Sequence, residues 1–213
     1  MTGAARRIGR RLLVIPADTV ASAADDQVII RLGAGAAFGD GAHPTTQLCL
    51  AALERQARIL ARPAADGRQW ALIDLGAGTG ILSIAAAQLG ARPILAVDID
   101  AQAVAEAHKN VALNQVTAAV RVEQVSLTEV RDGRYGPTQA PVVVANILAN
   151  VLVAFFDRGL VDTVTPGGLL ILSGILRTQG PEIRARLGWH GLTLAAEEKK
   201  EDWLCLVARR SHL

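Results

Sequence analysis

A glycine-rich turn between an apolar run and an alanine-rich segment constrains the fold of this chain more than any other feature. The turn is "DLGAGTG" (74–80), preceded by "WALIDL" (70–75) and followed by "ILSIAAAQLG" (81–90). A short apolar run that ends in a turn indicates a buried strand, and the longer apolar segment after it indicates a helix. The order strand, tight turn, helix is the repeating unit of α/β folds with a parallel sheet.

The same alternation continues along the chain and predicts an α/β fold. Further strands are expected at 92–100, 119–125, 141–148 and 168–176, and helices at 101–115, 149–164 and 179–188, with "TPGG" (165–168) as a turn. Residues 192–210 are expected to form two strands joined by a charged hairpin, which would put one antiparallel strand at the end of the sheet. Residues 61–69 are expected to be a surface loop.

Length and composition limit the number of domains and the kinds of partner. The chain has 213 residues, of which 51% are hydrophobic and 20% charged, as expected for one globular core. We expect a single domain over residues 1–213, with an extended lead-in at 1–36 and the core at 37–213, and a monomer. The net charge of +2 gives no indication of strong nucleic-acid binding.

The N-terminal segment and the cysteines bear on the cellular compartment. The apolar "LLVI" after "RRIGRR" is too short for a signal sequence or a membrane span, so we expect a cytoplasmic protein without membrane association. Cys49 and Cys205 have no CxxC spacing and no suitably placed histidine. Both are expected to be reduced core residues, and no metal site is expected.

The glycines of the turn predict a ligand at the carboxyl edge of the sheet. Gly76, Gly78 and Gly80 permit positive φ or a close approach of the backbone to a ligand, and open α/β sheets bind ligands at this edge. A dinucleotide-binding GxGxxG would need glycine where the chain has Ile81, which disfavours NAD. The pattern GxGxG after a strand that ends in an acid, here Asp74, is typical of S-adenosylmethionine-dependent methyltransferases.

A second acid supports the same site. Asp98 ends the next expected strand, 18 residues after Gly80, where doubly wound folds place the acid that binds ribose hydroxyls. The alternative is that Asp98 caps the following helix, although Asp100 is better placed as the N-cap. We therefore expect Asp98 to bind ribose.

Six motifs resemble, in order, those of the bacterial ribosomal protein methyltransferases called PrmA. They are "FGDGAHPTT", "DLGAGTGILSIAAAQLGA", "DIDAQAV", "NILA", "GGLLILSGIL" and "EDW", within residues 28–205. The glycine turn fits any class I methyltransferase, whereas "GxHPTT" with "NILA" and "SGIL" is much narrower. The resemblance implies a Rossmann-like sheet of seven mostly parallel strands, one of them antiparallel. It also implies an enzyme that uses S-adenosylmethionine to methylate amino groups of a ribosomal protein. Lysine side chains are the main expectation for these amino groups.

The resemblance further implies roles for individual residues. Thr46 resembles the family's threonine that contacts the cofactor from the "HPTT" loop, and Gly76 its motif glycine. Asp98 resembles the ribose-binding acid, and Asn146 the asparagine of "NILA" near the methyl group. The expected cofactor-binding residues are Thr46, Asp74, Gly76, Gly78, Gly80, Asp98 and Asn146.

Asn146 and His43 are the candidate catalytic residues. Methyl transfer from a sulfonium is an in-line displacement that needs a neutral amine held close to the methyl carbon. The side-chain oxygen of Asn146 could accept a hydrogen bond from that amine, or Asn146 could be a helix cap. His43 is a candidate general base because histidine titrates near neutral pH, or it could stiffen the loop beside Pro44. Trp203 either covers the substrate or packs on the sheet.

Two departures from the family pattern concern the acceptor. Asp40 stands where the family's loop usually has threonine, and its charge is expected to influence acceptor preference. Residues 1–27 are too short for the N-terminal substrate-recognition domain of these proteins, so the chain is interpreted as the catalytic domain without it.

Three alternatives to a ribosomal acceptor stay open. Another lysine methyltransferase with a non-ribosomal target would need an open groove beside Asn146, whereas a small-molecule N-methyltransferase would have a deep closed pocket there. A cofactor-binding scaffold without activity is the third alternative. The intact site residues argue against it.

Overall fold

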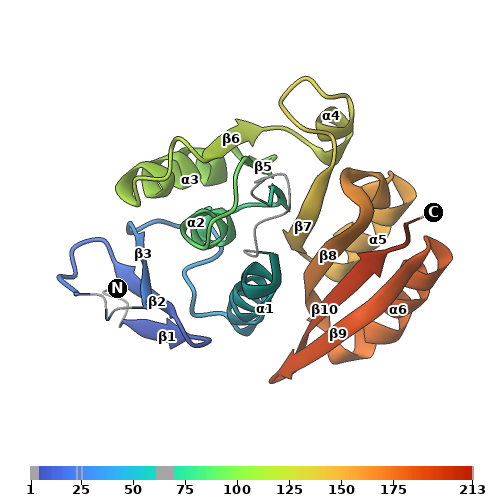
Figure 1. Cartoon of the computed structure of the whole chain (residues 1–213), viewed down its shortest axis with the longest axis horizontal. Helices are drawn as coiled ribbons and strands as arrows, with labels where there is room; N and C mark the ends of the chain where they lie inside the picture. Colours follow the sequence, from blue (N-terminus) through green and yellow to red (C-terminus); the bar gives the residue numbers. More distant parts are fainter. Residues whose placement is uncertain (1–4, 23, 25, 61–69, 213) are drawn as a thin grey trace.

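A seven-stranded sheet with helices on both faces forms the centre of the protein (Figure 1). The computed structural model describes residues 5–22, 24, 26–60 and 70–212. From edge to edge the strands are β6 (Val120–Gln124), β5 (Ile94–Asp98), β4 (Leu72–Leu75), β7 (Ala140–Asn146), β8 (Val164–Leu176), β10 (Trp203–Arg210) and β9 (Leu192–Lys200). Neighbouring strands from β6 to β8 are parallel, and β10 is antiparallel to β8 and β9. The predicted α/β sheet of seven strands, one of them antiparallel, is confirmed.

The helices divide into two layers because the central strands are apolar on both faces. Leu72 and Ile73 are adjacent in β4 and both fully buried, yet they belong to two separate apolar clusters, one on each face of the sheet. One face is covered by α1 (Pro44–Leu60), α2 (Ile81–Gln88) and α3 (Ala101–Leu113), and the other by α4 (Leu127–Arg131), α5 (Ala149–Asp157) and α6 (Gly180–Trp189).

The segment expected as an extended lead-in forms a small sheet of its own. It contains β1 (Arg6–Ile8), β2 (Leu12–Pro16) and β3 (Val28–Leu32), in that order. The hairpin β1–β2 is antiparallel and β2–β3 is parallel. The pairing of the lead-in into a sheet was not predicted.

Two side chains attach the small sheet to the main domain. The buried carboxylate of Glu54 in α1 accepts hydrogen bonds from the backbone N–H groups of Arg10 (2.9 Å) and Arg11 (2.6 Å) in the β1–β2 turn. Asn114, after α3, accepts from the Arg31 N–H at 2.8 Å and donates to the Arg31 carbonyl at 2.7 Å. Asn114 thus occupies the open edge of β3 in the way a further strand would.

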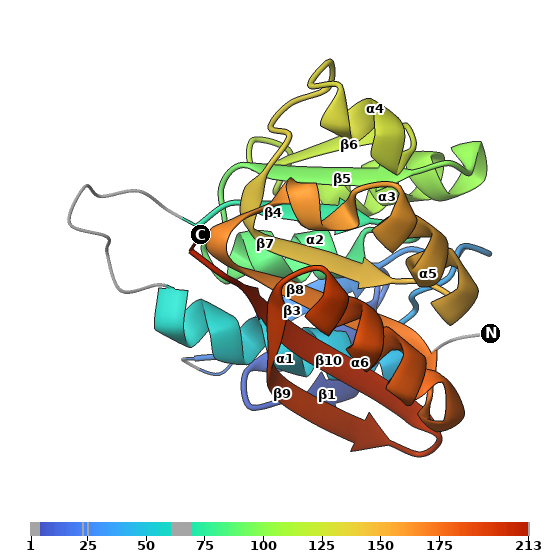
Figure 2. The same cartoon turned by 90° about the vertical axis from the view of Figure 1, so that its right-hand side faces the viewer.

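The position predicted for the antiparallel strand is wrong. This strand was expected at the end of the sheet, whereas β10 lies between β8 and β9 (Figure 2). Helix α6 carries the chain beyond the position next to β8, so that β9 becomes the edge strand. The hairpin, with Glu201 at a φ of 54°, then returns β10 into the gap.

Two boundaries near β8 also differ from expectation. The helix predicted over 149–164 ends at Asp157, because Gly159 adopts a φ of +82° and a separate 3₁₀ turn, Leu160–Thr163, follows. The expected "TPGG" turn lies inside β8, where Gly167, with a φ of +75°, belongs to a bulge that shifts the register against β7. The loop predicted at 61–69 lies outside the described residues.

We expect Asn114→Ala to destabilise the protein by about 1–3 kcal/mol, because it leaves the Arg31 N–H and carbonyl at the β3 edge without their partner. Urea unfolding checks this value. Gln102→Ala, at an exposed position of α3, is the control and should change stability by less than about 0.5 kcal/mol. Equal stability of the two variants would contradict the role given to Asn114.

Candidate functional site

A cleft of about 640 Å³ lies at the carboxyl ends of the parallel strands. Its walls come from the ends of β4, β5 and β7, from the segments that follow β5, β6 and β7, from α5, and from the loop before α1. This is the edge at which open α/β sheets bind their ligands. The predicted site residues that line it are His43, Gly76, Gly78, Asp98 and Asn146.

The glycine turn forms the floor of the cleft. Gly76 has a φ of +77° and Gly78 a φ of +54°, which L-residues with side chains rarely adopt. A Cβ on Gly76 would lie 2.4 Å from Cγ2 of Ile147, and one on Gly78 would lie 2.3 Å from the carbonyl oxygen of Phe38. Gly80 does not line the cleft, and packs against Ala107 of α3 at the start of α2.

Asp98 is held beside the turn by backbone groups. Its Oδ2 accepts from the Gly78 N–H at 2.9 Å and its Oδ1 accepts from the Asp100 N–H at 3.1 Å. Each carboxylate oxygen has a second lone pair that could accept from a hydroxyl of a ligand. Asp100 itself accepts from the Gln102 N–H at 2.9 Å, which confirms it as the N-cap of α3.

Asp74 lies beneath the turn and does not line the cleft. Its side chain is fully buried, and Oδ2 accepts a hydrogen bond from the Ser83 hydroxyl at 2.7 Å. Oδ1 has no hydrogen-bond partner among the described residues. Burial, and to a smaller extent the charge of Asp98, raises the pKa of Asp74 from 3.8 to about 7, against the lowering effect of Ser83.

Asn146 presents an unpaired acceptor at the other end of the cleft. The residue is only 9% exposed, and its Nδ2 lies 3.4 Å from Oγ1 of Thr46. Its Oδ1 is buried and, within the described part of the chain, has no hydrogen-bond partner. Leaving a buried amide oxygen unpaired costs about 1–3 kcal/mol, so a ligand with an N–H donor fits this position.

The two threonines of "HPTT" have different surroundings. Thr46 is fully buried and contacts Asn146 without lining the cleft, whereas Thr45 does line it. Sequence reasoning singled out Thr46 and missed Thr45. Both lie in the first turn of α1, where only the rotation of the helix against the sheet decides which side chain faces the cleft.

His43 is bound to its own loop. Its Nδ1 lies 2.8 Å from Thr45 Oγ1 and accepts from the Thr45 N–H at 3.3 Å. Both contacts fall on Nδ1, with donor and acceptor roles set by the tautomer of the ring, and they tie the ring to its own loop. They agree with the loop-stiffening alternative.

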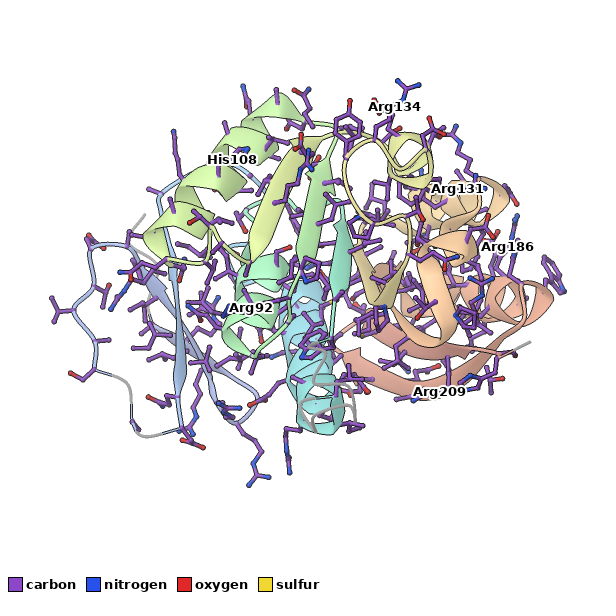
Figure 3. The ribbon with its side chains drawn as sticks, turned by 45° about the horizontal axis from the view of Figure 1, so that its top comes forward. Arg92, His108, Arg131, Arg134, Arg186 and Arg209 are labelled. Atoms are coloured by element: carbon purple, nitrogen blue, oxygen red, sulfur yellow. The ribbon has the colours of Figure 1, made fainter. Side chains whose placement is uncertain are left out.

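Three rings form one wall of the cleft. The His43 ring packs edge-on between Phe38, at 5.3 Å, and Trp203, at 4.9 Å between ring centroids. All three residues line the cleft, so Trp203 faces the site as well as the sheet. His108, by contrast, is exposed on the surface of α3 (Figure 3).

The remaining walls are apolar and were not predicted. Ile99, Val125 and Leu127 come shortly after the ends of β5 and β6 and line the cleft together with Asp98. The sequence carried no signal for them beyond their positions next to strand ends. At the rim, Ile99 is 75%, Leu148 63% and Phe38 53% exposed.

Metal and membrane features can be assessed for the described residues only. In residues 5–22, 24, 26–60 and 70–212, no three His, Cys, Asp or Glu residues are grouped so that they could hold a metal ion. No helix in the same ranges is both long and apolar enough to cross a bilayer. Cys49 and Cys205 are buried free thiols, and a hydrogen bond from Cys49 to Cys205 together with burial raises the pKa of Cys49.

The sheet order, the glycine turn and the acid that ends β5 are those of a class I methyltransferase. Magnesium protoporphyrin IX methyltransferase from Synechocystis PCC 6803, solved with bound SAM, shares the fold with a TM-score of 0.56 and 22% identity, over 82% of this chain and 88% of that one. The profile of the family described as "Ribosomal protein L11 methyltransferase (PrmA)" matches residues 5–211. The chain belongs to this family, as the motifs predicted.

Individual relatives agree with this assignment. The ribosomal protein L11 methyltransferase of Geotalea uraniireducens is 41% identical over 206 residues, which are 95% of this chain and 63% of that protein. The protein of the same name from Anoxybacillus flavithermus is 37% identical over 205 residues, 96% of this chain and 61% of that protein. The chain thus spans somewhat less than two thirds of their length.

A solved structure gives the same result. The crystal structure of ribosomal protein L11 methylase from Lactobacillus delbrueckii subsp. bulgaricus superposes with a TM-score of 0.82 at 32% identity, covering 98% of this chain and 99% of that one. The predicted Rossmann-like class I methyltransferase fold is therefore confirmed.

We expect Asp74 to make stability depend on pH. Because the folded-state pKa is raised, the folded protein binds more protons than the unfolded chain between about pH 4 and 7. The free energy of unfolding should therefore fall as pH rises through this window, by about 4 kcal/mol at most.

Asp74→Asn should flatten this decline, because an amide does not titrate. Urea unfolding at intervals between pH 4.5 and 8 measures the slope for parent and variant. Asp18→Asn, at an exposed position, should keep the parent slope. An unchanged slope in Asp74→Asn would show that the pKa of Asp74 is not raised.

Proposed function

We propose that this chain is an S-adenosylmethionine-dependent methyltransferase that methylates amino groups of ribosomal protein L11, with residues 1–213 acting as one methyltransferase domain. The observation that carries the proposal is the unpaired Oδ1 of Asn146, a residue that lines the same cleft as the glycine turn. A cofactor cradle and an acceptor for an amine N–H are the two parts that N-methyl transfer needs.

The residues of the cleft fit S-adenosylmethionine. Gly76 and Gly78 line the cleft with backbone in the positive-φ conformation, and Asp98 has lone pairs for the two ribose hydroxyls. The cleft beside Ile99 and Leu127 is apolar, as an adenine ring requires. When bound, this cofactor supplies a methyl group activated on a sulfonium.

Asn146 would orient the acceptor. Its Oδ1 accepts one N–H of a neutral amine, which turns the nitrogen lone pair away from Asn146 and toward the centre of the cleft. The contact of Nδ2 with Thr46 at 3.4 Å restricts rotation of the amide. Positioning of this kind, without covalent chemistry by the protein, can supply most of the acceleration of an in-line displacement.

The rim of the cleft supports a protein acceptor over a small molecule. Phe38 and Leu148 line the cleft and are more than half exposed, so the site opens to the surface beside apolar side chains. An open groove of this kind suits a segment of a protein, whereas a metabolite would be enclosed. A ribosomal protein as acceptor would also agree with the predicted cytoplasmic location.

Transfer of label tests the function directly. The protein is incubated with methyl-labelled S-adenosylmethionine and with purified L11, and in parallel with a bacterial extract, followed by mass spectrometry. Label on L11 amino groups is expected. Label on another protein or on a metabolite would reassign the acceptor.

Calorimetry with S-adenosylmethionine tests cofactor binding. It should show binding that Asp98→Ala weakens at least ten-fold. Absence of binding by the parent would exclude the proposed methyltransferase activity.

We expect Asn146→Ala to lower turnover by about 100-fold or more while the affinity for S-adenosylmethionine changes little, because the lost group contacts the acceptor. Turnover with L11 and calorimetry with the cofactor measure the two effects separately. His108→Ala, at an exposed position of α3, is the control and should retain both. Unchanged turnover in Asn146→Ala would remove this residue from the mechanism.

A further inference from the structure

Thr79 of the glycine turn makes three hydrogen bonds that do not involve the cleft. Its N–H donates to the Phe38 carbonyl at 3.0 Å, and its hydroxyl donates to the Gly39 carbonyl at 2.7 Å. Its own carbonyl accepts from Nδ2 of Asn110 at 3.0 Å. Thr79 is only 3% exposed and does not line the cleft. The side chain therefore serves a contact between two segments of the protein.

The turn and the loop before α1 approach each other backbone to backbone. A Cβ on Gly78 would lie 2.3 Å from the Phe38 carbonyl oxygen. A Cβ on Gly39, whose φ is +110°, would lie 2.9 Å from Thr79 Oγ1. Neither position has room for a side chain, so any displacement of one segment must be transmitted to the other.

A second anchor holds the start of the same loop. Asn110 of α3 is 1% exposed, and its Oδ1 accepts from the Gly33 N–H at 2.9 Å while its Nδ2 donates to Thr79. Glu106, one helical turn earlier, accepts from the Ala37 N–H at 3.1 Å. The loop from Gly33 to Gly39 is thus attached to α3 and to the glycine turn at three places.

The loop continues into the ring wall of the cleft. Phe38 is the residue whose carbonyl Thr79 holds, and its ring contacts His43, which in turn contacts Trp203. A chain of direct contacts therefore runs from the turn proposed to cradle the cofactor to the wall that faces the acceptor side.

We propose that Thr79 is a positioning residue. It fixes the position of the ring wall, formed by Phe38, His43 and Trp203, relative to the glycine turn. The inference rests on the proposed function, in which one ligand lies on the turn and the other between Asn146 and the rings. Since methyl transfer requires the reacting atoms within about 3–3.5 Å, a small displacement of the wall costs rate without removing cofactor contacts. Thr79 thereby links the two halves of the site.

The test compares Thr79→Val, which keeps the shape and removes the hydroxyl donor, with Thr79→Ser, which keeps the donor. Thr163→Val is the matched control, because Thr163 is also fully buried and donates to a backbone carbonyl, that of Leu160, at 2.6 Å, outside the cleft. Gly39→Ala disturbs the same contact from the loop side and serves if Thr79→Val does not fold.

Three quantities are measured for each variant. The first is the affinity for S-adenosylmethionine by calorimetry, and the second is kcat and KM with L11 as the acceptor. The third is acrylamide quenching of Trp203 fluorescence in the ligand-free protein, measured with Trp70 and Trp189 replaced by Phe. Thr79→Val and Gly39→Ala should lower kcat/KM for the acceptor at least ten-fold, keep cofactor affinity within about three-fold, and make Trp203 easier to quench. Thr79→Ser, which keeps the hydroxyl donor, should have parent values of all three quantities. Thr163→Val should also have parent values.

Two results would overturn the inference. One is unchanged Trp203 quenching and kcat/KM in Thr79→Val and Gly39→Ala. The other is a loss of cofactor affinity as large as the loss of kcat/KM, which would make Thr79 a support of the turn alone. If the parent binds no S-adenosylmethionine, the proposed function fails, whereas quenching of Trp203 in the ligand-free protein still decides whether Thr79 positions the wall.

Discussion

The bend of the chain after β4 is the constraint on which the rest of the site depends. The N–H groups of Gly76 and Ala77 both donate to the Val97 carbonyl at 2.9 Å, which draws the turn over the end of β5. Asp98, the next residue of β5, then accepts a hydrogen bond from the Gly78 N–H. Because this geometry needs positive φ at both glycines, the turn, the acid and the floor of the cleft form one unit.

Buried side-chain atoms without a hydrogen-bond partner occur in the site and also, among the described residues, at Trp70, Gln88 and Arg186. In the site, Asp74 and Asn146 each keep one buried oxygen without a partner among the described residues, the first beneath the turn and the second on a residue that lines the cleft. Such groups cost stability, and proteins retain them mainly where a ligand or a reaction uses them.

Patterns of neighbouring residues were sufficient to predict most of the main sheet. The run "VVVA" (142–145) is apolar throughout because β7 is covered on both faces, and Asp100 could be identified as the N-cap because capping depends on two residues of local sequence. The place of β10 could not be predicted in this way. A hairpin strand can lie at the edge of the sheet or between two other strands, depending on how far α6 carries the chain across the sheet. Local periodicity contains no such information.

The same distinction separates the residues of the site. The sequence by itself determined a parallel sheet with a glycine turn, an acid at the end of the next strand and the membership of the chain in its family, because these depend on local conformation and on short motifs. Only the tertiary structure decided that Thr45 and not Thr46 lines the cleft, that Asp74 lies under the turn, and that Thr79 holds the loop. Each of these depends on how helices are rotated and packed against the sheet, and packing is set by contacts between segments far apart in the chain.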